Sequence, residues 1–276
     1  MKIYPKTSLQ DMSEEMNEIN RNSEGMELQF FHEKNIADKF DFESLIRQRK
    51  EEFPNLKEII VHPPLSDYNI ELLVLKDREL IASQLHKLVE LSKELNIKIC
   101  INYHTYWTKE QYKASGLADT IKEYLKIIEN TEVIMLIENL FMLLDEKEEC
   151  SVIEICKYID HPNLRACIDT THMHCKANIL KKDFNTMLHE ELNKEDCEKY
   201  VKQIHFAAAL NNDGYVEKKT HGRKHENYES LKKELAWLEE FGMKDKIYVT
   251  EVSEEDYFAR TDQIEEIKML QKAIKE

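Results

Sequence analysis

The sequence is poor in glycine and proline, with five residues of each in 276. It contains neither GxGxxG nor a GxxxxGKS or GxxxxGKT loop, which argues against a nucleotide cradle of the dinucleotide-binding or P-loop type. No Pro/Gly-rich linker, low-complexity tract or internal repeat divides the chain. We therefore predict a single domain over residues 1–276, a length that suits one large α/β barrel.

The chain also lacks segments typical of export or membrane insertion. No apolar run approaches the roughly 18–20 residues that span a bilayer. The first residues, MKIYPKTSLQDMSEE, have no apolar region of the kind found in signal peptides. The six cysteines form no CxxC pair, so we expect reduced thiols rather than a disulfide framework. These absences predict a cytoplasmic protein with no membrane partner.

Positive charge is scarce. The chain has 54 acidic and 39 basic residues, a formal net charge of −15, and most of its basic residues are lysines. Such a field repels polyanions at long range, and few arginines are available as planar phosphate clamps. The composition disfavours nucleic acid as a partner, although a local basic patch would still permit such binding.

Short β-rich segments alternate with helical segments along the chain, about eight of each. Several strand segments are continuous apolar runs, typical of parallel strands buried on both faces. Residues 78–95 and 117–128 carry apolar helical stripes, and residues 229–242 end in a glycine placed as a helix stop. This alternation predicts an α/β fold, a single closed (β/α)8 TIM barrel, with an open doubly wound sheet as the alternative. The predicted strands are residues 2–6, 26–31, 58–64, 97–104, 132–140, 164–172, 201–209 and 246–252.

Ionisable side chains stand at or near the ends of six successive predicted strands. A charged group directly after a buried apolar run is costly unless it is paired or binds a metal. One histidine in such a place is ordinarily a packing residue, but six strands in order favour a shared pocket, because barrel strand ends converge on one mouth. Imidazole with carboxylate is a ligand set for Zn²⁺, Mn²⁺ or Fe²⁺. The side chains are His62, His104, Glu138, Asp169 followed by His172, His205 and Glu251.

The segments VHPPLSDYN, INYH, LIENL, CIDTTH, IHF and VTEV, in this order, resemble the xylose-isomerase-like TIM-barrel superfamily. That superfamily (AP endonuclease family 2) includes sugar-phosphate isomerases and epimerases and the endonuclease IV-like nucleases. The resemblance covers nearly the whole chain. It implies a common divalent metal, zinc or manganese, with one ion expected and two or three as the alternative. The ligands it implies are Glu138, Asp169, His205 and Glu251.

The nuclease branch of this superfamily implies further metals. Positions matching His62 and His104 bind a second metal there, with the Glu138 carboxylate bridging. Positions matching His172 and His225 help to hold a third metal.

The chain departs from the nuclease pattern in three places. Arg223 stands where an Asp is expected two residues before His225, and the YESLKKEL that follows is predicted to be helical rather than glycine-rich. The opening strand, KIYPKTS, lacks the small residues and histidine of the nucleases. These departures weaken the nuclease interpretation and leave the four-ligand site intact.

Three functions remain open at this point. In a sugar or sugar-phosphate isomerase or epimerase, Glu138 and Glu251 act as paired acid and base, while the metal polarises the substrate carbonyl. In an endonuclease IV-like phosphodiesterase acting on abasic DNA, two metals that share Glu138 activate a water. A non-catalytic barrel with a vestigial metal site is the third. We favour the first, because of the acidic charge, the scarce arginine and the altered segment 221–230.

The favoured function predicts a small carbohydrate as the partner and leaves the oligomeric state open. In the nuclease alternative, Tyr68, Asn69 and Trp107 are candidates for DNA contacts. The expected contacts to a sugar come from His62, His104, His172, Arg223 and Asn139.

The dense stretch CIDTTHMHC, residues 167–175, is not expected to form a closed zinc site. We predict that Cys167 packs in the core and that Asp169 faces the mouth as a metal ligand. His172 is left open as a supporting group, a substrate contact or a ligand of another metal. His174 and Cys175 are expected in the loop after the strand. Residues 181–200 are predicted to be polar and mostly helical.

Overall fold

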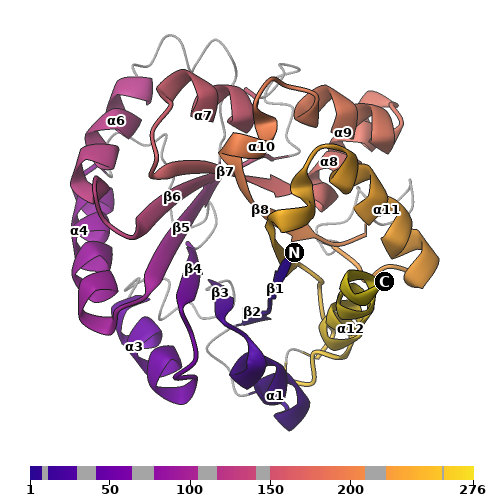
Figure 1. The fold of residues 1–276 in the computed structure, drawn as a ribbon, viewed down its shortest axis with the longest axis horizontal. Coiled ribbons are helices and arrows are strands. Elements are labelled where there is room, and N and C mark those ends of the chain that lie inside the picture. Colours follow the sequence, from indigo (N-terminus) through magenta and orange to yellow (C-terminus); the bar gives the residue numbers. More distant parts are fainter. Residues whose placement is uncertain are drawn as a thin grey trace.

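The computed structural model describes residues 1–7, 12–29, 42–63, 78–104, 117–140, 150–208, 222–256 and 258–276. They form a nine-stranded parallel sheet in the order β1-β9-β8-β7-β6-β5-β4-β3-β2, which curls into a nearly closed barrel with helices outside it (Figure 1). The predicted α/β TIM barrel is confirmed, and the open-sheet alternative is wrong. The strands are β1 Lys2–Tyr4, β2 Lys6–Thr7, β3 Gly25–Gln29, β4 Glu58–His62, β5 Lys98–His104, β6 Val133–Glu138, β7 Leu164–Asp169, β8 Val201–Phe206 and β9 Ile247–Thr250.

The first predicted strand is split in two at Pro5. β1 pairs with β9, whereas β2 pairs with β3. Proline has no N–H to donate to a ladder and often interrupts a strand, but the Pro5 carbonyl still accepts a hydrogen bond from Glu27 N at 2.9 Å. The split segment thus links β9, the last strand, to β3 around the barrel. Because it counts as two strands, the sheet has nine strands where eight were predicted.

The helices follow local capping signals. α4 (Arg78–Leu95) covers its predicted range, and α11 (Tyr228–Glu240) begins where the Asn227 and Ser230 side chains each accept from the other's backbone N–H. Gly242, just after α11, has a φ of 76°, the left-handed region that glycine tolerates. The other helices are α1 Glu14–Asn22, α3 Phe42–Glu52, α6 Leu117–Ile128, α7 Val152–Ile159, α8 Thr170–Leu180, α9 Phe184–Leu192, α10 Cys197–Tyr200 and α12 Thr261–Lys275, with the 3-10 turn η4 Met243–Asp245.

The strand predicted over residues 164–172 ends at Asp169, and α8 begins at the next residue. The Asp169 side chain caps α8, because its Oδ1 accepts from His172 N at 2.6 Å. His174 and Cys175 therefore lie in α8, and the predicted loop is wrong. In the described part of the chain, neither residue joins a group with metal-ligand spacing.

Side chains that point into the barrel form three layers. Because side chains alternate along a strand, β4 directs Glu58, Ile60 and His62 inward, while Ile59 and Val61 join the core beneath the helices. The middle layer is an apolar plug, and polar side chains lie on both sides of it. The plug comprises Tyr4, Ile60, Cys100, Leu136, Cys167, Ile247 and Val249. Cys167 thus packs in the core, as predicted.

All six cysteines are free thiols, as the sequence predicted. Among the described helices, none combines the length and apolar character needed to cross a bilayer.

Candidate metal centre

Four side chains from neighbouring strands converge at the carboxyl end of the barrel. Glu138 ends β6, Asp169 ends β7, His205 lies near the end of β8, and Glu251 directly follows β9. One oxygen or nitrogen atom from each lies within 4.8 Å of the others, and all four residues are buried. Parallel pairing produces this convergence, since Asp169 stands directly opposite His205. The structure brings together the four residues that the resemblance grouped.

His205 is oriented by a carboxylate on the far side of its ring. Its Nε2 lies 2.8 Å from Glu27 Oε2. A carboxylate only accepts, so Nε2 carries the hydrogen and Nδ1 is the nitrogen presented to the converging acids. Nδ1 lies 2.6 Å from Glu251 Oε2 and 3.3 Å from Glu138 Oε2.

A buried lysine joins this network. Lys6 Nζ lies 3.0 Å from Glu27 Oε1 and 2.6 Å from Glu251 Oε1. Gln203 Nε2 donates to Glu27 Oε2 at 2.5 Å. Burial alone would raise the pKa of Glu27, but His205 and Lys6 lower it to about 2. Glu27 is therefore ionised and holds His205 and Lys6 together.

Three further histidines surround Glu138. His104 Nε2 and His172 Nδ1 each lie 3.5 Å from Glu138 Oε1, and His62 Nε2 lies 3.6 Å from Glu138 Oε2. The Asn102 amide donates to Oε2 as well. His62, His104 and Glu138 form a second group with metal-ligand spacing. Glu138 belongs to this group and to the group with Asp169, His205 and Glu251.

Charge states follow from this crowding. Burial opposes ionisation of Glu138, but His205 and His104 hold its pKa well below the usual value. Burial lowers the pKa of His172 to about 4 against the attraction of Glu138, so this imidazole is neutral at pH 7. A neutral imidazole can act as a ligand or as a hydrogen-bond partner.

Asn139 connects the ends of β6 and β7. Its amide donates to the Asp169 carbonyl at 3.1 Å and accepts from Asp169 N at 2.8 Å. Its own carbonyl accepts from His172 Nδ1 at 2.7 Å. These bonds make Asn139 a residue that positions Asp169 and His172, while its predicted contact with substrate stays a prediction.

His225 does not join the cluster with His172. Its Nδ1 lies 2.5 Å from Glu266 Oε1, and its Nε2 lies 2.9 Å from Glu234 Oε2. Both ring nitrogens face carboxylates of α11 and α12, so we do not carry the third-metal role of His225 forward. The Arg223 side chain is exposed, and its backbone pairs with Ala208.

The sequence reasoning missed the supporting residues Lys6, Glu27, Asn102 and Gln203. The signal was present for two of them, because Glu27 interrupts an apolar strand and Gln203 shares an inward face with His205 by period-two alternation. Tyr68, Asn69 and Trp107, and the ends of the strands predicted over 26–31, 58–64 and 201–209, lie outside the described residues.

The donor set suits a divalent transition metal. Three carboxylates and one imidazole offer oxygen and nitrogen atoms within 4.8 Å of one another. Mixed nitrogen and oxygen ligation of this kind suits zinc, manganese or iron. The outer contacts from Glu27 and Asn139 are the kind that orient metal ligands.

We compared the sequence with known protein families. The sequence pattern described as "Xylose isomerase-like TIM barrel" matches residues 22–273. The chain belongs to this family. A comparison with curated protein sequences gave no match.

Solved structures with the same fold align with almost the whole length of this protein. A D-tagatose 3-epimerase-like protein has a TM-score of 0.60 at 18% identity, covering 100% of this chain and 97% of the other. A xylose isomerase domain protein from Planctomyces limnophilus has a TM-score of 0.65 at 13% identity, covering 99% and 96%. The IOLI protein with a binding zinc atom has a TM-score of 0.65 at 16% identity, covering 99% and 98%. At these identities the similarity establishes the fold alone.

Proposed function

We propose that this protein is a divalent-metal-dependent isomerase or epimerase of a sugar or sugar phosphate. The observation that supports this most is the approach of Glu138, Asp169, His205 and Glu251 to within 4.8 Å of one another. Family membership supports the reaction class, as do structural neighbours described as epimerase-like and as a sugar phosphate isomerase/epimerase.

These four residues are the proposed metal ligands. The bound ion, zinc or manganese, would polarise the carbonyl of a hydroxy-carbonyl substrate. Glu27 keeps the Nδ1 of His205 facing the site, and the α8 cap leaves Asp169 Oδ2 facing His205 at 3.7 Å.

Glu138 and Glu251 are the proposed acid and base. They come from β6 and β9, and the strands that carry Asp169 and His205 lie between them. One carboxylate removes a carbon-bound proton and the other returns it. The low pKa of Glu138 keeps this group in its basic form at neutral pH.

The histidines beside Glu138 are the proposed contacts to substrate oxygens. His62, His104 and His172 surround this carboxylate at 3.5–3.6 Å. His62 Nδ1 faces the Pro63 carbonyl at 3.1 Å, which turns its Nε2 toward the site. Arg223 stays among the proposed substrate contacts. Its side chain is exposed, and its backbone pairs with Ala208, which follows β8.

One observation favours a second candidate, a two-metal phosphodiesterase. His62 and His104 form a separate ligand group with Glu138, and a one-metal isomerase does not need both. In that enzyme Glu138 would bridge two ions and a water would attack a phosphodiester. This candidate enzyme would have no third metal site, because Arg223 is exposed and both ring nitrogens of His225 face Glu234 and Glu266.

Solvent deuterium exchange tests the isomerase proposal. Protein loaded with zinc or manganese is incubated in D2O with a panel of ketoses, aldoses and their phosphates. We expect deuterium at a substrate carbon, and exchange about 10²–10⁴-fold slower in Glu251→Gln. Glu18→Gln, which removes an exposed carboxylate on α1, should keep the wild-type rate.

Metal content and cleavage of abasic duplex separate the alternatives. One metal per chain with exchange supports the isomerase. Two metals with duplex cleavage and no exchange would overturn it in favour of the phosphodiesterase. Bound metal with neither reaction would overturn it in favour of the vestigial site. Glu138→Gln should abolish either activity. This variant therefore tests whether Glu138 belongs to the active site, and it does not distinguish an isomerase from a phosphodiesterase.

A further inference from the structure

The opening of the barrel opposite the proposed metal centre holds a cavity of about 510 Å³. Its lining comes from residues at or beside the amino ends of β1 and of β3 to β9. Six lysines and Arg165 line this opening, against the acids Glu24, Glu58 and Asp245. We call it the basic pocket.

The charge of the basic pocket is opposite to that of the molecule. Seven cationic and three anionic side chains line it. Lys98 and Lys199 also pair with Glu132 and Asp160 beside the lining, which leaves two more cations than acids, whereas the whole chain has a formal net charge of −15. A concave surface lined by one sign of charge concentrates the electrostatic potential and attracts ions of the other sign. The pocket is thus a local exception on an acidic protein.

Three of its cations have no carboxylate at ion-pair distance in the described part of the chain: Lys2, Arg165 and Lys246. Arg165 Nη1 donates to the carbonyls of His161 and Leu164 at 2.9 and 2.6 Å, and Lys246 Nζ donates to the Glu198 carbonyl at 2.6 Å. Burial, with a smaller effect of the Arg165 charge, lowers the pKa of Lys246. Carbonyl contacts orient these cations without neutralising them.

The floor of the basic pocket is a buried ionic network. Lys202 Nζ lies 2.7 Å from Glu58 Oε1, and Tyr4 OH donates to Glu58 Oε2 at 2.9 Å. Both oxygens of Glu58 are engaged, so its charge is offset within the floor. The apolar plug lies directly beyond and separates this pocket from the metal centre.

We propose that the basic pocket binds a small anion carrying two or three phosphate groups, at a site distinct from the metal centre. The three cations without a carboxylate at ion-pair distance, Lys2, Arg165 and Lys246, supply positive charge for such an anion, and about 510 Å³ lies within the usual range of small-molecule pockets. Lysine ammonium groups bind phosphate oxygens as point charges, and Arg165 adds a planar donor. The acidic remainder of the surface disfavours a long polyanion.

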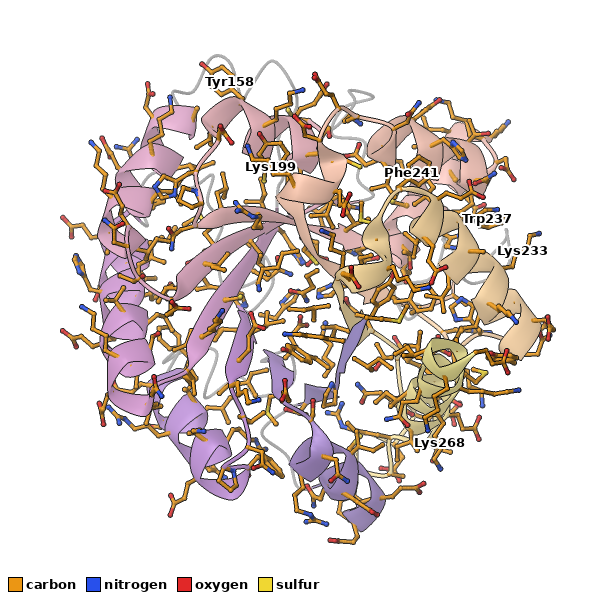
Figure 2. All side chains as sticks on the ribbon, in the orientation of Figure 1. Tyr158, Lys199, Lys233, Trp237, Phe241 and Lys268 are labelled. Carbon is orange, nitrogen blue, oxygen red and sulfur yellow. The ribbon has the colours of Figure 1, made fainter. Side chains whose placement is uncertain are left out.

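Calorimetric titration with tripolyphosphate, at fixed salt and with the metal-loaded protein, tests the proposal. Wild type should bind one equivalent, and Arg165→Gln with Lys246→Gln should weaken binding at least about tenfold, since two charge-assisted contacts are lost. The matched control is Lys233→Gln with Lys268→Gln, which removes the same charge from α11 and α12 (Figure 2). It should stay within about twofold of wild type. Inorganic phosphate should bind more weakly, and ADP should compete with tripolyphosphate.

Lysine acetylation read by mass spectrometry keeps the test independent of how the variants fold. Tripolyphosphate should protect Lys2 and Lys246 in the wild type and leave Lys233 unchanged. This protection separates binding here from chelation of a metal at the other end of the barrel. The proposal is overturned if wild type does not bind, if the pocket lysines are not protected, if both double variants lose affinity equally, or if only an oligonucleotide binds.

Discussion

At the scale of single residues, Glu27 touches three polar side chains at once. It accepts from Gln203, faces His205 Nε2 at 2.8 Å and pairs with Lys6 at 3.0 Å. Its exposed fraction is 0%. A buried carboxylate with this many partners fixes the tautomer and the ring orientation of His205, which in turn sets the direction of one proposed ligand atom.

Replacing Glu27 by Gln should weaken metal binding without changing a ligand. The amide keeps the shape but removes the negative charge that holds His205 and Lys6. We expect about 10–100-fold lower affinity for zinc or manganese, measured by competition with a chromophoric chelator. Glu18→Gln should bind as wild type does, and equal affinities for wild type and Glu27→Gln would contradict the orienting role.

Gly222 is a second residue on which the site depends. Its φ is +45°, and a Cβ there would lie 2.0 Å from the Glu251 carbonyl oxygen. Gly222→Ala should therefore displace Glu251 and cost at least about 1 kcal/mol of unfolding free energy. We expect both the metal affinity and the free energy of unfolding to be lower than in the wild type, when the two are measured on the same protein.

Gly242→Ala is the matched control for that change. Gly242 also has a positive φ, +76°, but its Cβ would meet the Glu198 side chain instead. We expect this variant to lose stability and keep its metal affinity. Equal losses of affinity in both variants would show that backbone strain, rather than contact with Glu251, is responsible.

At the scale of elements, a chain of alternating imidazoles and carboxylates joins α8, α11 and α12. His174 Nε2 lies 2.5 Å from Glu234 Oε1, and His225 bridges Glu234 and Glu266 at 2.9 and 2.5 Å. The His225 N–H also donates to Glu266 Oε2 at 3.0 Å. Since Asp169 is the N-cap of α8, this chain of side chains fixes the helix that directly follows a proposed ligand.

The His225 bridge should make stability depend on pH. Burial opposes protonation, but Glu234 and Glu266 raise the pKa of His225 to about 9, above the ordinary value of 6.5. The contribution is fully present below about pH 6.5 and is lost as pH rises through about 9; its size is about 3 kcal/mol. In urea denaturation, the deficit of His225→Gln relative to wild type should shrink between pH 6 and pH 9.5.

A surface histidine provides the comparison for that experiment. His86 is exposed on α4, so His86→Gln should unfold as wild type does at each pH. A deficit of His225→Gln that stays constant from pH 6 to pH 9.5 would argue against a charged bridge and for a packing role alone.

At the scale of the whole molecule, the barrel interior is polar at both openings and apolar between them. The proposed metal centre draws its side chains from the ends of the neighbouring strands β6 to β9. A metal bound there would cross-link these strands in the folded state and not in the unfolded chain. Ligands that bind only the folded state stabilise it by mass action.

Chelation should therefore lower the melting temperature. At a free metal concentration about 100 times the dissociation constant, bound metal adds about 2.7 kcal/mol, or roughly 5–10 °C for a chain of this size. Adding back zinc or manganese should restore the melting temperature in wild type and not in Asp169→Asn. Identical melting curves with and without metal would count against the four-ligand site.

Much of the fold followed from local pattern. Short β-rich segments, several of them continuous apolar runs, predicted all eight strand regions, and the apolar stripe of residues 78–95 predicted α4 to the residue. Boundaries at the site were harder, because the Asp169 side chain caps α8 and so ends β7 earlier than the apolar pattern indicates. The split at Pro5 depends on two different pairing partners, which no local pattern contains.

The sequence by itself predicted the barrel and ionisable side chains at six strand ends, because apolar runs and the residues that follow them are local properties; the choice of four proposed ligands among them came from the family resemblance. Only the tertiary structure decided which side chains contact and orient the proposed ligands. Lys6, Glu27 and Gln203 reach the site across strands that are distant along the chain, and His225 is engaged by α11 and α12 rather than facing His172. The basic pocket also exists only in three dimensions, since closing the barrel gathers the amino ends of its strands into one opening.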